Sequence, residues 1–239
     1  MLTNYTFVEL LASQKLGAVW PLNPIKYAIR GAVESGVPAI TIVLLLLLPV
    51  VAAAIAAARH LIGLRGFGIF LPAALSVVFV ATGPVVGIAL FLIIMAISLA
   101  LRTILKKLRM RLQYLPRMAF LLWAVCFSVL GILFLAPIVK YPDVTNVSIF
   151  PVLFLALLSE DFSRVQLGKS ISVAVSLTSE TLILALVSYL FLTFYPLQKF
   201  ALLNPEALLA LVLVFDFLVG KYVGLRFLEF FRFRRLIQN

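Results

Sequence analysis

Seven long apolar stretches lie between Val37 and Leu225, and the charged residues fall almost entirely in the gaps between them. Hydrophobic residues make up 64% of the 239 residues and charged residues only 12%, whereas a soluble domain is about 25% charged. A helix that crosses a bilayer needs roughly 20 apolar residues. A membrane accommodates seven such stretches and a water-soluble core of this size does not, so the sequence predicts an all-α integral membrane protein with seven transmembrane helices.

The sequence divides into three predicted parts. Residues 1–36 form an interfacial segment outside the cytoplasm, residues 37–225 form the membrane domain, and residues 226–239 form a basic, aromatic tail in the cytoplasm. In the first part, Pro24 suits the start of a short amphipathic surface helix and Gly36 suits its end. The predicted spans cover residues 37–58, 67–82, 84–101, 118–139, 146–159, 171–195 and 206–225.

Lysine and arginine are distributed unevenly between alternate loops. Most of them follow the first, third, fifth and seventh predicted spans. Loops rich in these residues mark the cytoplasmic side of a membrane protein. The predicted topology is therefore N-terminus out and C-terminus in, in a multi-pass membrane protein.

Two of the seven stretches are short and carry a proline near their start, at Pro72 and Pro151. They occupy matching places in two triplets of spans, which fits a 3+3 inverted repeat followed by a seventh helix. Paired interrupted helices point to a binding site near the middle of the membrane, because proline removes a backbone N–H. The alternative is that each proline simply lies in the first turn of its helix.

Two carboxylates fall inside predicted spans, Glu180 in the sixth and Asp216 in the seventh. A charge at the bilayer centre costs on the order of 3 kcal/mol, so such a residue is by default a candidate functional group. The alternative is a structural role, in which a neutral Glu180 hydrogen-bonds to hydroxyl groups of neighbouring helices. Together with Pro72 and Pro151, these two residues are the candidate midplane site.

Basic residues form a second candidate surface, which would contact lipid or a cytoplasmic partner. Arginines alternate with phenylalanines in the C-terminal tail, a pattern typical of an interfacial anchor; we prefer this interpretation to nucleic-acid binding. The candidate contacts are Arg102, Lys106, Lys107, Arg109, Arg111, Arg117, Arg232, Arg234 and Arg235.

The sequence carries no recognisable catalytic set. Cys126 is the single cysteine and His60 the single histidine, which excludes a His/Cys zinc cluster within the chain. Neither a phosphate-binding loop nor a dinucleotide fingerprint is present. We therefore predict no enzymatic activity, no metal and no cofactor.

Several short motifs, in their order and spacing, resemble a bacterial seven-transmembrane domain that is usually fused to an inactive transglutaminase-like domain. The resemblance covers roughly residues 40–235, and the paired proline motifs are also distantly similar to the small membrane subunit of poly-gamma-glutamate synthesis. The motifs are Arg65–Pro72, Pro116–Ala119, Ser148–Pro151 with Glu160, Gly220–Arg226 and Phe231–Phe233.

The resemblance implies a multi-pass protein of the bacterial cytoplasmic (inner) membrane. It also implies a periplasmic transglutaminase-like domain and a cytoplasmic ATP-grasp peptide ligase as partners, besides the lipid bilayer itself. It assigns no catalytic residues. The predicted role is a non-enzymatic membrane platform for an envelope or amino-acid/peptide-ligase system. The alternative is a transporter or conduit for a small solute or peptide, with Pro72, Pro151, Glu180 and Asp216 lining its path.

Overall fold

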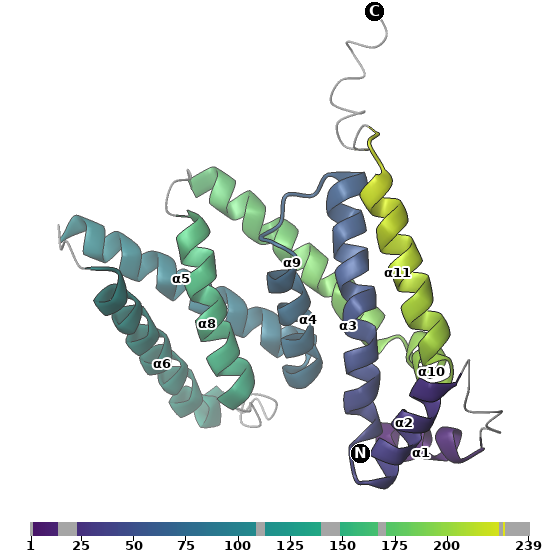
Figure 1. Cartoon of the computed structure of the whole chain (residues 1–239). Coiled ribbons are helices and arrows are strands. Elements are labelled where there is room, and N and C mark those ends of the chain that lie inside the picture. Colours follow the sequence, from purple (N-terminus) through teal and green to yellow (C-terminus); the bar gives the residue numbers. More distant parts are fainter. Residues whose placement is uncertain are drawn as a thin grey trace, which may run out of the picture. The chain divides into compact units, whose positions relative to one another are not determined.

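The computed structural model describes residues 2–13, 23–108, 113–139, 149–166, 171–224 and 227, and within these ranges the regular structure is helical, without strands (Figure 1). This confirms the all-α fold class. The elements are α1 (Leu2–Ser13), α2 (Pro24–Glu34), α3 (Ala39–Ala57), the π-helical turn η1 (Ala58–Ile62), α4 (Phe70–Thr82), α5 (Pro84–Lys107), α6 (Tyr114–Val139), α8 (Ile149–Gln166), α9 (Ile171–Thr193), α10 (Tyr195–Leu203) and α11 (Pro205–Lys221).

Proline defines where most of these helices start. Helices α2, α5 and α11 begin with a proline, α10 carries one at its second position, and α4, α6 and α8 carry one at their third. The first backbone N–H groups of a helix have no partner within it, so a proline there removes no hydrogen bond. Pro49 differs, because it lies inside α3, where its ring removes the N–H that would bond to the carbonyl of Leu45.

Three of the described helical segments are long and apolar enough to cross a membrane, namely Ala39–Ile62, Pro84–Leu105 and Val175–Thr193. The consecutive helices α10 and α11 would form a fourth, but they are bent by 108° at their junction. Two further apolar helices, Phe70–Thr82 and Leu115–Gly131, are shorter. These segments support a membrane-spanning protein, and the complete set of seven spans stays a prediction.

The chain forms two compact units. Unit 1 comprises residues 1–73 and 183–239, and unit 2 comprises residues 74–182. The boundaries fall within α4 and α9, whereas the predicted inverted repeat would divide the chain between the third and fourth spans.

Unit 1 is built around α3 and α11, which lie side by side (Figure 1). They run in the same direction, because the start of α11 meets α2, the helix that leads into α3, and the end of α11 meets η1. The short helices α1 and α10 pack on α3 and on each other, and α2 packs on α11. One row of side chains spaced four residues apart makes the buried face of α3. This row is Ala39, Val43, Leu47, Val51 and Ile55.

Unit 2 contains α5, α6 and α8, which pack against one another. Their buried side chains recur every three or four residues, as expected for one buried face of each helix. The turn from α4 into α5 places Gly83 at a φ of 80°, a conformation that glycine adopts without strain. Gly87 follows, where a Cβ atom would lie 2.5 Å from the buried ring of Phe79. The absence of a side chain at Gly87 therefore allows the two helices to approach closely at this corner.

Candidate functional site

The two ends of the α3–α11 pair carry the polar contacts of unit 1. We call the end with α2 and the start of α11 the α2 end. There, the backbone N–H of Lys26 donates a hydrogen bond of 3.0 Å to Oε1 of Glu206. Lys26 is the third residue of α2, so its N–H has no partner within that helix. The side chain of Asn23, the N-cap residue of α2, forms no capping hydrogen bond. The carboxylate of Glu206 therefore takes the place of that acceptor.

Glu206 itself belongs to the first turn of α11. Its carboxylate therefore lies at the positive ends of two helix dipoles, that of its own helix and that of α2, and both favour a negative charge. Its second oxygen, Oε2, is buried and has no hydrogen-bond partner in the part of the chain that the structure describes. A buried acceptor without a partner is costly, so Glu206 is held at this position by the packing of the helices around it.

Further contacts join the short helices at the α2 end to one another. The guanidinium group of Arg30 in α2 donates to the carbonyl of Leu11 in α1. The ring of Phe7, which is completely buried, stacks on Tyr195 of α10 at 6.0 Å. The buried amide of Gln198 donates a 2.6 Å hydrogen bond to the carbonyl of Leu192, which fixes α10 against the end of α9. Short helices that could not be stable alone are thereby joined into one cap.

The opposite end of the pair, which we call the His60 end, contains η1 and the last turn of α11. The Nε2 atom of His60 lies 2.8 Å from the carbonyl oxygen of Tyr222, and the two rings meet edge to face at 6.2 Å. A carbonyl can only accept, so Nε2 carries the hydrogen. Gly63 ends η1 with a φ of 95°. Helical segments of π type are rare and occur often at functional sites.

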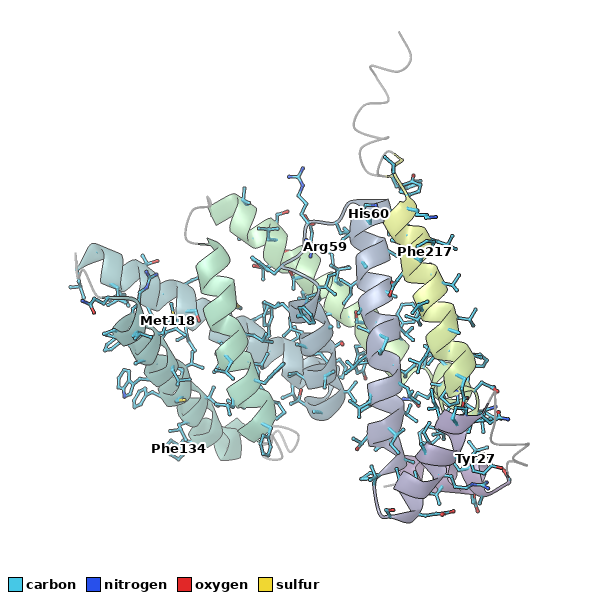
Figure 2. The ribbon with its side chains drawn as sticks, in the orientation of Figure 1. Tyr27, Arg59, His60, Met118, Phe134 and Phe217 are labelled. Atoms are coloured by element: carbon cyan, nitrogen blue, oxygen red, sulfur yellow. The ribbon has the colours of Figure 1, made fainter. Side chains whose placement is uncertain are left out.

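The two ends differ in charge. The described residues of η1, the loop to Arg65 and the last turn of α11 carry basic side chains and no carboxylate, namely Arg59, His60, Arg65 and Lys221. The helices of the α2 end carry both signs, with Glu9, Lys26, Arg30, Glu34, Lys199 and Glu206. Figure 2 shows Arg59, His60 and Phe217 toward one end of the pair and Tyr27 toward the other.

The two predicted midplane prolines are buried, and each is the third residue of its helix. Pro72 in α4 belongs to unit 1 and Pro151 in α8 to unit 2. In the first turn neither proline breaks a hydrogen-bond ladder. Their positions thus match the alternative interpretation in the sequence, that of helix starts, and several other helices share the feature.

The two predicted carboxylates lie in different surroundings. Glu180, half-buried in α9, accepts a 2.9 Å hydrogen bond from the hydroxyl of Ser176, one turn earlier in the same helix. Asp216 is exposed on α11, and among the described residues it forms no hydrogen bond or ion pair. Glu180 belongs to unit 2 and Asp216 to unit 1.

The structure describes only part of the predicted basic surface. Lys107, the last residue of α5, is exposed, and Arg117, in the first turn of α6, is half-buried. Arg102 and Lys106 lie on α5, and their side chains fall outside the described part. The remaining predicted contacts, Arg109, Arg111, Arg232, Arg234 and Arg235, also lie outside the described residues.

Sequence reasoning missed Glu206, His60 and Tyr222 as interacting residues. A local signal existed for Glu206, because an acidic residue directly after Asn204 and Pro205 is typical of the first turn of a helix. Tyr222 lies within one of the motifs that carry the family resemblance, and His60 lies just before another. No local pattern in the sequence indicates that Glu206 contacts Lys26 or that His60 contacts Tyr222.

Residues 39–237 match the model of a family described as seven transmembrane helices usually fused to an inactive transglutaminase. The resemblance predicted from the motifs is thereby confirmed. No curated protein and no solved structure matches the chain. The match covers most of the sequence and includes the apolar helices of both units. The chain therefore belongs to this family of membrane-spanning proteins.

Proposed function

We propose that this protein is a non-enzymatic membrane platform, which holds a transglutaminase-like domain on the outer side of the bacterial inner membrane and a partner at its cytoplasmic face. The observation that carries the proposal is the family itself, whose members are usually fused to an inactive transglutaminase. A membrane domain that accompanies a catalytically inactive domain is suited to binding and positioning. The ATP-grasp ligase suggested by the resemblance stays a prediction for the cytoplasmic partner.

The α2 end supports this proposal. The family match begins at residue 39, and α1 and α2 precede it in the chain. Both helices are nonetheless fixed to the matched region, α2 through the hydrogen bond to Glu206 and α1 through the stacking of Phe7 on Tyr195. A domain bound at this end would be held by several helices together and not by a flexible connection.

The experiment that tests the proposal places a photoactivatable cross-linking amino acid at three exposed positions, in cells that produce the protein. Lys199 on α10 reports on the α2 end, Lys107 reports on the predicted cytoplasmic loop, and Leu213 on the apolar surface of α11 serves as the control. We expect a protein adduct that contains a transglutaminase-like domain at position 199, a different protein at position 107, and lipid at position 213. Lipid adducts alone at all three positions would contradict the platform.

Transport is tested with the purified protein in liposomes. A platform gives no proton or solute flux above that of empty liposomes, and Glu180→Gln and Asp216→Asn leave the cross-linked partners unchanged. A flux that either substitution abolishes would instead favour the conduit, because proton-coupled transport needs an ionisable group within the membrane.

A further inference from the structure

The His60 end of the α3–α11 pair gathers cations from two helices that are far apart in sequence. The hydrogen bond between His60 and Tyr222 joins residues 162 positions apart. Arg59 directly precedes His60 and Lys221 directly precedes Tyr222, so this contact brings the backbone of both cations to the same end of the pair. Arg65 follows in the loop after η1. The arrangement comes from the fold and not from a run of basic residues in the sequence.

Two of these cations have no anionic partner among the residues that the structure describes. The side chains of Arg59 and Lys221 form no hydrogen bond or ion pair with any described residue. The ammonium group of Lys221 lies 4.4 Å from the ring centroid of Phe217, a cation–π contact that keeps it near the surface of α11 and leaves its hydrogen-bond donors available. The ends of η1 and α11 thus present positive charge that the described part of the protein does not neutralise.

The depth of this end fits the headgroup layer of a membrane. The apolar segment Ala39–Ile62 has 24 residues, which corresponds to a length of about 36 Å for a regular helix, against a hydrocarbon thickness of about 30 Å. His60 and Arg59 therefore reach the boundary of the hydrocarbon when α3 spans it. Exposed apolar side chains adjoin the cations, and Val223, beside Tyr222, is 96% exposed.

We propose that the His60 end binds the headgroup of an anionic phospholipid, and that Arg59 and Lys221 both contribute to the binding of its phosphate. Phosphate oxygens accept hydrogen bonds from both cations. Hydrogen bonds between charged groups are stronger than those between neutral groups. Tyr222 and Val223 contact the apolar part of the same lipid. A free inorganic phosphate would bind to the two cations but would make no contact with the apolar residues. A lipid therefore fits this surface better.

The test uses the complete chain in nanodiscs of phosphatidylcholine that contain a minor fraction of phosphatidylglycerol. Native mass spectrometry measures how many phosphatidylglycerol molecules remain bound to each chain, and titration measures their affinity. We expect Arg59→Gln combined with Lys221→Gln to lower this affinity on the order of tenfold. Arg59→Lys combined with Lys221→Arg keeps both charges and should retain most of the affinity.

The matched control is Lys26→Gln combined with Lys199→Gln, which removes the same charge from the α2 end. It should leave the bound phosphatidylglycerol unchanged, because the backbone N–H of Lys26, and not its side chain, binds Glu206. An equal loss in both double variants would overturn the proposal, since it would show an effect of net charge alone. Displacement of the lipid by millimolar inorganic phosphate would likewise overturn it, in favour of a soluble anion.

The single variant Lys221→Gln serves as the control for folding, because it changes only one exposed side chain at the end of α11. This variant should unfold like the unmodified protein and still bind phosphatidylglycerol several-fold more weakly. Unchanged affinity in a folded Lys221→Gln variant would also contradict the assigned site.

Discussion

The α2 end and the His60 end terminate the same two parallel helices, yet they are built differently. At the α2 end, three short helices cover the helix starts, and a carboxylate of α11 caps α2. At the His60 end, η1 contacts the end of α11 through the exposed side chain of His60, which meets the carbonyl and the ring of Tyr222, and the charged side chains described there are basic. The first end pairs an unsatisfied helix N–H with a carboxylate of the protein itself, whereas the second leaves cations available to something outside the protein.

This difference indicates how one pair of helices can serve two purposes. A helix N–H and a carboxylate oxygen that are shielded from water are costly unless they are held together, so we expect the α2 end to be the more rigid of the two. A surface hydrogen bond and exposed cations contribute little to stability, so the His60 end is suited to binding and can change partners without unfolding unit 1.

The largest expected effect comes from Glu206→Ala. This change removes the acceptor for the N–H of Lys26 and the charge at two helix starts, and we expect a loss of about 1–3 kcal/mol in the free energy of unfolding. Unfolding in mixed micelles with increasing SDS measures it. Glu34→Ala is the control, since Glu34 is an exposed carboxylate at the other end of α2. Equal effects of the two substitutions would show that the cap does not stabilise the α2 end.

His60→Ala should have a smaller effect, about 0.5 kcal/mol, because the lost hydrogen bond is exposed to solvent. Its main consequence should be local. Backbone amides of η1 and of the last turn of α11 should exchange hydrogen faster, while those of α2 should not change. His60→Gln keeps an N–H donor and should restore part of the protection. Faster exchange at α2 as well would mean that the two ends are not independent.

The smallest effect should come from Asp216→Asn, between the two ends. Asp216 is exposed and forms no hydrogen bond or ion pair among the described residues, and asparagine has nearly the same shape. We expect a change below about 0.5 kcal/mol in the same SDS titration. A much larger change would show that Asp216 has a partner outside the described part. Asp216 would then again be a candidate functional carboxylate.

Much of the local structure was predictable, because its signals are local. The start of α2 at Pro24 and its end before Gly36, which has a φ of 99°, match the sequence prediction. The predicted starts of the first, third and seventh spans likewise lie within two residues of the starts of α3, α5 and α11. The predicted end of the third span at Leu101 falls short of the end of α5 at Lys107, because helical hydrogen bonds continue where the apolar pattern stops.

The candidate site was not predictable in the same way. Lys26 and Glu206 are 180 residues apart, and no pattern in one sequence pairs such positions. For Pro72 and Pro151, the sequence allowed both a matched pair of interrupted helices and simple helix starts. Both prolines lie in the first turn of their helices, and the midplane site stays a prediction. The structure shows the same feature at the starts of many helices, so it carries less information about a binding site than the two short stretches indicated.

The parallel pairing of α3 with α11 has a consequence for how the protein is made. Helix α3 leaves the ribosome long before α11, and the whole of unit 2 is synthesised between them. Residues 74–182 can therefore pack while the chain is still growing, but α3 and α2 must wait for α11 before the faces that contact it are covered. During that interval, the first part of unit 1 depends on the surrounding lipid or on a chaperone, and a chain that stops before Pro205 never completes it.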